Sequence, residues 1–491
     1  MNILLINPPA EVLKQEGSLI FPPLGLLYIG AVLEKAKHKV RIVDCVARNW
    51  NKPKKNKKGG ETFYRFDVEE DYLRNFILDF QPEFVGIANL FATSEDTCIK
   101  LAGEIKKYNK AIKIVVGGTN ASARAHFFLE HDCIDFVILG EGEYTFRDLV
   151  SYLKDNADYT TLPGLCFKKD NKISISPTFN WIKNLDELPF PAYHLLENSI
   201  ENYFHGKFGN FFVENRILTT TTSRGCVRNC VFCSGMKYLG HWRERSPENV
   251  IEELLYLKNN FGVKEIAFVD ANINLKKDRF VGIMNLMKEG NLNLKWSPFG
   301  GIFVQTFTPD LVKLMRQTGC HSMNLAVEHG DTNMQKYIGK IVPLEKVQLI
   351  IKECKKYGIW SHCYFVVGLP GETEDSLNKC LDYAKKANFD SLSFMVGTPL
   401  PGSRLYDDLS ERKLLKSGDL RFTAKKNSWT DLEPAYLTAK IKKFMINYAV
   451  YKIINEFRPD NLFWRIRTFN SSNIKIYRWV LIRFFKNLIF R

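Results

Sequence analysis

The feature that most constrains the fold of this chain is a regular alternation of short apolar, β-branched runs with amphipathic helical segments. In the first third of the sequence, strand-like runs occupy 2–7, 39–44, 83–88, 112–118 and 135–140, and helical patterns such as 24–37 and 94–108 lie between them. Strands that alternate with helices predict a parallel sheet with right-handed crossovers. Such sheets bind ligands at the carboxyl ends of their strands, so the segments that follow these runs are candidate binding loops.

A second series of the same kind begins at residue 216. Its strand-like runs are 217–223, 265–270, 294–299, 322–328, 360–368 and 391–397, and its helical patterns are 247–260, 275–289, 308–318, 333–357 and 373–387. Six such units predict a barrel or partial barrel with its chemistry at the carboxyl ends of the strands. The expected fold class is therefore α/β, with an N-terminal Rossmann-like parallel sheet over 1–155, a linker and hairpin region over 156–215, a (β/α)6 partial TIM barrel over 216–410 and a mostly helical region over 411–491.

The composition is ordinary for a folded, soluble protein, with 25% charged residues and a net charge of +15. The chain has no apolar run of the ~20 residues that a membrane span requires. The N-terminal sequence MNILLINPPA lacks the basic region and cleavage site of a secretory signal, so a cytoplasmic location is expected. The 11 cysteines would then stay mostly reduced. A lysine-rich segment over 51–60 is expected to be an exposed, mobile loop.

Three cysteines, Cys226, Cys230 and Cys233, are spaced C-x3-C-x2-C just after the first strand of the second series. Thiolates bind zinc or iron–sulfur clusters, and a zinc site would need a fourth ligand such as His241. A trio of buried free cysteines is a further alternative. Three thiolates on a [4Fe–4S] cluster would leave one iron without a protein ligand, and an open metal position is typical of catalysis.

The C-x3-C-x2-C spacing, with Phe232 before the last cysteine, resembles the signature of the radical S-adenosylmethionine (SAM) enzymes. The segments FVDANINLKKDR (268–279), TGCHSMNLAVEHGD (318–331), YFVVGLPGET (364–373) and GTPLPGSRLY (397–406) are similar to later strands of that family. The resemblance implies that the open iron binds SAM and that SAM is cleaved to a radical that abstracts hydrogen from the substrate. It also implies SAM contacts at Phe232, Asp270, Glu328, Gly368 and Gly371. Ala271 and His329 depart from the family pattern, which usually has an acid and a serine there.

The first domain resembles the cobalamin-binding (B12-binding) domain that precedes many radical SAM barrels. The similar segments are 22–44, 85–91, 115–123 and 137–149. The resemblance implies that cobalamin contacts lie at Asn7, Pro8, Gly117, Gly118, Gly140, Glu141, Gly142 and Glu143. The D-x-H-x-x-G motif that supplies a cobalt ligand in many such domains does not occur, because the loop DCVARNW (44–50) has no histidine. The alternative is a domain that kept the fold and lost the cofactor.

These resemblances imply a cobalamin-dependent C-methyltransferase that acts on an unactivated carbon of a small or lipid-like substrate, with an electron donor of the flavodoxin or ferredoxin type. A radical SAM cyclase or rearrangement enzyme and a non-enzymatic cluster or cobalamin sensor are the alternatives. The basic amphipathic segment 473–491 predicts either contact with the inner face of a membrane or a terminal helix packed on the barrel. Basic charge alone also suits nucleic acid, but no recognised nucleic-acid module is present, so that partner is not expected.

Overall fold

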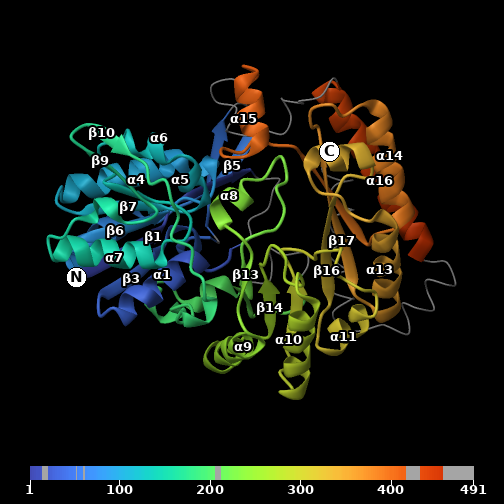
Figure 1. Cartoon of the computed structure of the whole chain (residues 1–491), viewed down its shortest axis with the longest axis horizontal. Helices are drawn as coiled ribbons and strands as arrows, with labels where there is room; N and C mark the ends of the chain where they lie inside the picture. The colour runs from blue at the N-terminus through green and yellow to red at the C-terminus, as the bar shows by residue number, and fades with distance from the viewer. Residues whose placement is uncertain (14–19, 51, 59–60, 205–211, 416–431, 457–491) are drawn as a thin grey trace.

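The computed structural model describes residues 1–13, 20–50, 52–58, 61–204, 212–415 and 432–456. Figure 1 shows the N-terminal sheet and its helices on one side, in blue to cyan, and the strands of the second series on the other, in green to orange. Short 3-10 turns occur at Ala92–Ser94, Tyr159–Thr161, Leu185–Glu187, Tyr193–Leu195 and Ile200–Tyr203. The segment 473–491, for which a membrane or packing role is predicted, lies outside the described residues.

The first sheet has seven strands in the order β10-β9-β8-β7-β6-β1-β3. Their bounds are β1 Asn2–Asn7, β3 Lys39–Asp44, β6 Phe84–Ala88, β7 Lys113–Gly117, β8 Phe136–Ile138, β9 Leu165–Lys169 and β10 Lys172–Ser174. The five predicted strands pair in parallel, which confirms the expected parallel sheet. The hairpin at Asp170 and Asn171, both with positive φ, adds two antiparallel strands at the edge. This sheet therefore continues into the range expected to be a linker.

Helices cover both faces of this sheet. They are α1 Leu24–Lys35, α2 Cys45–Arg48, α3 Glu70–Phe80, α4 Glu95–Tyr108, α5 Thr119–Ala123, α6 Ala125–Leu129 and α7 Glu143–Lys154. Successive side chains of β1 alternate between two cores: Ile3 and Leu5 pack with α1 and α7, and Leu4 and Ile6 pack with α3 and α4. Burial on both faces explains why this strand is a continuous apolar run in the sequence.

Part of the lysine-rich segment is a strand, so the prediction of a loop is wrong for Lys54–Lys58, although Lys54, Lys55 and Lys57 are exposed as expected. β4 Lys54–Lys58 pairs antiparallel with β5 Glu61–Phe66, which pairs with β2 Ala10–Leu13. Asn56 also donates a hydrogen bond to Glu11 at 3.1 Å. Lysines on an edge strand remain in water while the backbone pairs, so charge alone does not indicate a loop.

The second series forms six strands: β11 Ile217–Thr220, β14 Glu265–Phe268, β15 Lys295–Pro298, β16 Ser322–Glu328, β17 Trp360–Val367 and β18 Ser391–Val396. They form two parallel three-stranded sheets in chain order. A parallel bridge between Trp296 and Cys320 joins the two sheets. This is the strand order expected of a partial barrel, and it brings the carboxyl ends of all six strands to one side.

The helices of the second series are α9 Pro247–Phe261, α10 Lys277–Glu289, α11 Leu311–Gln317, α12 Thr332–Ile338, α13 Leu344–Tyr357 and α14 Glu374–Ala387. The single helix predicted over 333–357 is wrong, because Gly339, at φ +80°, ends α12 and Pro343 precedes α13. Two further helices, α15 Arg404–Glu411 and α16 Pro434–Glu456, follow the strands. None of the described helices is both long and apolar enough to cross a membrane.

Candidate functional site

The three cysteines lie on a loop closed by a short two-stranded ribbon. Its strands are β12 Ser223–Arg224 and β13 Arg243–Glu244, and the loop between them includes α8 Gly235–Leu239. Gly225 has φ +87°, and a side chain there would lie 2.1 Å from the carbonyl oxygen of His241, so only glycine fits this close approach. The Cys226 amide donates to the Gly240 carbonyl at 3.2 Å, which ties the two sides of the loop together.

The thiols differ in exposure and receive hydrogen bonds. Cys230 is buried, Cys226 is half-buried and Cys233 is exposed. Cys226 Sγ accepts from Asn272 Nδ2 at 3.2 Å, and Cys233 Sγ accepts from the Gly235 amide at 3.2 Å. Burial raises the pKa of Cys230 to about 12. The pKa of Cys233 is also raised, because the surrounding protein desolvates its sulfur although the residue as a whole is exposed, and the hydrogen bond from Gly235 acts the other way. Metal binding therefore has to displace protons from these thiols.

This donor set fits an iron–sulfur cluster. In the described part of the chain, no three His, Cys, Asp or Glu side chains converge as ligands of a metal ion. A cubane cluster takes each thiolate on a different iron, so the three sulfur atoms surround the cluster at larger separations than the ligands of a single metal ion. N–H groups directed at the sulfurs, such as those of Asn272 and Gly235, are a recognised feature of cluster sites. The His241 ring, the candidate fourth zinc ligand, is on an exposed residue.

Asp270, a predicted SAM contact, is fully engaged with the base of the cysteine loop. Its carboxylate accepts from the Thr222 amide at 3.0 Å, from Thr222 Oγ1 at 2.8 Å and from Ser223 Oγ at 2.6 Å. Burial raises the pKa of Asp270, and these hydrogen bonds oppose the rise. Asp270 thus fixes the start of the loop, and a contact with SAM stays a prediction.

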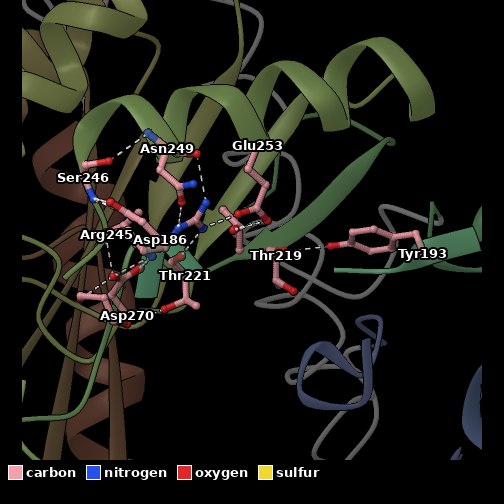
Figure 2. A network of polar contacts seen from close by, with 12 residues as sticks. Asp186, Tyr193, Thr219, Thr221, Arg245, Ser246, Asn249, Glu253 and Asp270 are labelled. Carbon is pink, nitrogen blue, oxygen red and sulfur yellow. Dashed lines mark hydrogen bonds and ion pairs between the residues drawn. The ribbon is translucent and has the colours of Figure 1, made fainter. Parts of the chain in front are cut away.

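Figure 2 shows a network of polar contacts centred on Arg245, which is buried. Arg245 directly follows β13, so the network lies at the base of the cysteine loop. Arg245 donates to the Thr221 carbonyl at 2.9 Å and to Asn249 Oδ1 at 2.7 Å, and it forms an ion pair with Glu253. The Ser246 amide donates to Asp186 Oδ1 at 3.0 Å. The network joins the end of β11 to the start of α9, so the cysteine loop emerges from a rigid base.

Glu328 lies at the carboxyl end of β16, near the cysteines. It is 7% exposed, its φ is +67°, and the register of β16 against β17 shifts next to it. Lys340 Nζ lies 2.8 Å from Glu328 Oε1, and both charges influence the Cys230 thiol. Sequence reasoning missed Lys340, which carries no motif. A buried carboxylate on a strained backbone, close enough to raise the pKa of Cys230 and Cys233, favours a binding role for Glu328.

The other predicted SAM residues also lie around this end of the barrel. Phe232 packs with Cys230 and other apolar residues. The Gly368 amide donates to Glu372, whose other oxygen lies 2.9 Å from His329 Nε2. Gly371 has φ +78° and nothing within 4 Å of where a side chain would begin. His329, which departs from the family pattern, is therefore part of a buried structural pair with Glu372.

The carboxyl edge of the first sheet faces the cysteine loop. Helix α5, which follows β7, contacts α8 of the loop. Arg224 lies 2.8 Å from Glu143, and Arg243 lies 2.7 Å from Glu141. Glu141 and Glu143, predicted to contact cobalamin, are thus bound to arginines of the second domain. Gly140 and Gly142 pack closely against Trp181 and Ile29, respectively. Sequence reasoning missed Arg243 and Trp181 altogether.

Of the other four predicted cobalamin residues, Gly117 has open space around it, whereas Asn7, Pro8 and Gly118 are engaged with or covered by neighbouring residues. Pro8 is buried, and Asn7 donates to Asp44 Oδ1 at 2.8 Å. A side chain at Gly117 would meet nothing closer than 4.0 Å, whereas one at Gly118 would meet the Asn89 carbonyl at 2.6 Å. Nearby, Leu90 and Phe91 are exposed after β6. The open backbone at Gly117 and the exposed side chains of Leu90 and Phe91 fit a large, largely apolar ring such as a corrin.

The fold and the site define a two-domain α/β protein in which a loop with three cysteines faces the carboxyl edge of a parallel sheet. The B12 binding domain family matches residues 12–150, and the Radical SAM superfamily matches residues 220–384. The chain is 32% identical over 450 residues to an uncharacterized methyltransferase of Pyrococcus horikoshii, covering 90% of this chain and 89% of the relative. It therefore belongs to the radical SAM superfamily of enzymes, within the group that carries a B12-binding domain.

Two further relatives agree with this assignment. The cytidylyl-2-hydroxyethylphosphonate methyltransferase of Streptomyces wedmorensis is 29% identical, with 82% of this chain and 80% of the relative covered. The structure of the radical SAM methyltransferase TsrM of Kitasatospora setae, with cobalamin and a [4Fe-4S] cluster bound, superimposes with a TM-score of 0.67 at 16% identity. That match covers 84% of this chain and 75% of TsrM. The chain is thus similar in sequence to two methyltransferases and shares the fold of TsrM.

Proposed function

We propose that this protein is a cobalamin-dependent radical SAM C-methyltransferase. The observation that carries the proposal is that the loop with Cys226, Cys230 and Cys233 lies against the carboxyl edge of the B12-binding domain. When bound, the cluster with SAM supplies a hydrogen-abstracting radical, and cobalamin supplies the methyl group. The chain brings both sites to one interface, and bringing the groups together is the protein's part in such chemistry.

Different residues of this chain would bind the cluster, SAM and cobalamin. Cys226, Cys230 and Cys233 would hold the cluster, and Glu328, oriented by Lys340, would bind SAM. Asn7, Pro8, Gly117 and Gly118 would contact cobalamin at the opposite face. The first domain offers no histidine in the 44–50 loop, where its Asp44 is instead buried and hydrogen-bonded to Tyr203 at 2.8 Å. Cobalamin would therefore bind without an imidazole from that loop on cobalt.

The same interface suggests the kind of substrate. Phe21, Phe212 and Phe299, from three distant segments, form an edge-packed trio with ring centroids 5.7–5.9 Å apart. All three are only half-buried. Phe299 directly follows β15, so the trio lies at the carboxyl end of the barrel strands. Half-buried aromatic rings at such a position favour a substrate with an apolar or flat group.

The inner face of the barrel adds polar groups. Phe365 and Phe394 face the helices, because their rings contact Tyr383 and Phe444. His362 and Tyr364 alternate with Phe365 along β17, so they lie on the opposite face, with ring centroids 4.6 Å apart. We therefore propose a small or lipid-like substrate that combines an apolar part with a hydrogen-bonding group.

The test uses anaerobically reconstituted protein, dithionite and SAM labelled in its methyl group. Cytidylyl-2-hydroxyethylphosphonate and a hopanoid in vesicles serve as candidate substrates. Label in a product, absent from a Cys230→Ala variant, supports the proposal. Formation of 5′-deoxyadenosine with an altered but unlabelled product would indicate a cyclase or rearrangement enzyme instead. Loss of all corrinoid on gel filtration would overturn the cobalamin part.

A further inference from the structure

The two arginines at the ends of the cysteine loop face each other. Arg224 and Arg243 are cross-strand partners in the β12–β13 ribbon. Like charges directly opposite each other in an antiparallel pair destabilise it. The ribbon that closes the loop therefore needs a compensating negative charge.

Glu141 supplies that charge from the other domain. Its Oε1 lies 3.3 Å from Arg224 Nη1, and its Oε2 lies 2.7 Å from Arg243 Nη1. Glu143 adds a second carboxylate, 2.8 Å from Arg224 Nη2. We call these four residues the carboxylate clamp. It contains two positive and two negative charges and is therefore neutral as a whole.

The four side chains of the clamp are largely buried, and further contacts fix the positions of the two arginines. The exposed fractions of its four side chains are 16% for Arg224, 13% for Arg243, 9% for Glu141 and 5% for Glu143. Arg243 also donates to the Ile182 carbonyl at 2.8 Å, and Arg224 lies over the Tyr28 ring at 4.8 Å. Buried ion pairs gain little net stability because of desolvation, and their best-attested use is to fix one arrangement among several.

We propose that Glu141 and Glu143 are positioning residues that hold the cysteine loop closed from the first domain. Their carboxylates neutralise Arg224 and Arg243, so the ribbon stays closed at the base of the three cysteines. Without these two negative charges, the two arginines repel each other and the loop opens. The inference goes beyond the proposed function. It rests on the proposed function only for the statement that the loop holds an iron–sulfur cluster.

The experiment is hydrogen–deuterium exchange on the metal-free, full-length protein, compared between wild type and a Glu141→Gln/Glu143→Gln variant. Both substitutions keep the side-chain shape and remove the charge. We expect exchange to rise at least tenfold in peptides that cover residues 223–244, with the core strands β1 and β16 unchanged. A Glu197→Gln variant, which breaks the surface pair between Arg41 and Glu197 at 2.7 Å, is the matched control and should leave residues 223–244 unchanged.

Unchanged exchange at residues 223–244 in the double variant, or an equal rise in all peptides, would overturn the inference. A second readout uses reconstituted protein: the magnetic coupling between the reduced cluster and cob(II)alamin should weaken in the double variant and persist in the Glu197→Gln control. Failure of wild type to take up cluster or cobalamin would count against the proposed function, while the exchange data would still decide the role of the clamp.

Discussion

The indole ring of Trp181 lies directly against the backbone of Gly240, where a side chain would begin 2.9 Å from the ring. Trp181 makes the same contact with Gly140 of the first domain, also at 2.9 Å. Its ring is stacked on Phe179, with centroids 4.8 Å apart. One aromatic side chain of the connecting segment thus packs against both domains, beside the cysteine loop.

This contact predicts a large effect of Gly240→Ala on stability. The backbone there has φ +72° and ψ −172°, a region essentially restricted to glycine that costs an alanine about 1–3 kcal/mol, and the overlap with the ring costs about 1–3 kcal/mol more. Gly371→Ala is the matched control, because its φ is +78° and the space around it is open. Thermal unfolding should therefore show a clearly larger loss for Gly240→Ala, and equal losses would contradict the packing described for Trp181.

Removal of the cluster should expose the cysteines to alkylation in a fixed order. Cys233 is an exposed residue and Cys230 is a buried one, and desolvation of the sulfur atoms raises the pKa of both thiols. Iodoacetamide attacks the thiolate, so labelling should be slow at pH 7 and rise about tenfold per pH unit below each pKa. Mass spectrometry should find Cys233 labelled before Cys230, while the fully buried Cys354 and Cys363 stay unlabelled. Equal labelling with and without the cluster would contradict the ligand assignment.

Local sequence patterns predicted the secondary structure well where the residues of a segment themselves determine which side chains are buried. The runs 2–7, 39–44 and 322–328 are strands with those bounds, because their apolar residues fill a core on both faces. The pattern over 333–357 was misleading, because helical periodicity continues across the break at Gly339. The segment Lys54–Lys58 was missed because its pairing depends on residues 61–66, not on its own composition.

Only those parts of the site that carry a sequence motif could be predicted. The strand pattern predicted that the three cysteines follow the first strand of the second series, and they lie at the carboxyl ends of its parallel strands. Their role as cluster ligands stays a prediction. The ion pairs of Arg224 and Arg243 join residues up to 102 positions apart, and nothing local to Glu141 distinguishes an interdomain partner from a ligand contact. The sequence therefore predicts cobalamin contacts for Glu141 and Glu143, whereas the structure pairs both with arginines. Contact with cobalamin stays a prediction.

Ionisation of Asp44 should make stability fall as the pH rises. Burial raises the pKa of Asp44 in the folded protein, although hydrogen bonds from Tyr203 and Asn7 oppose the rise. The folded state therefore binds the proton more tightly than the unfolded state, and this contribution to stability is lost as the pH rises through the folded pKa. An Asp44→Asn variant lacks the effect.

The difference in unfolding temperature between wild type and Asp44→Asn should therefore shift against wild type between pH 4 and pH 7. The altered hydrogen bonds should change the unfolding temperature of the variant by the same amount at every pH. The test is therefore how the difference in unfolding temperature changes with pH. A difference that is independent of pH, or one that shifts in favour of wild type, would show that the pKa of Asp44 is not raised.

Glu328 should be needed for SAM binding and not for cluster assembly. Its carboxylate is held by Lys340 at 2.8 Å beside the cysteines, and a Glu328→Gln variant replaces a charged acceptor with a neutral one of the same shape. Hydrogen bonds to charged groups contribute about 1.5–3 kcal/mol, so SAM affinity should fall about 10- to 100-fold. Equilibrium dialysis of SAM against reconstituted protein measures this loss, and iron analysis should give the same cluster content as wild type. Glu345→Gln, at an exposed position on α13, is the control and should bind SAM as wild type does; unchanged affinity in Glu328→Gln would remove Glu328 from the SAM site.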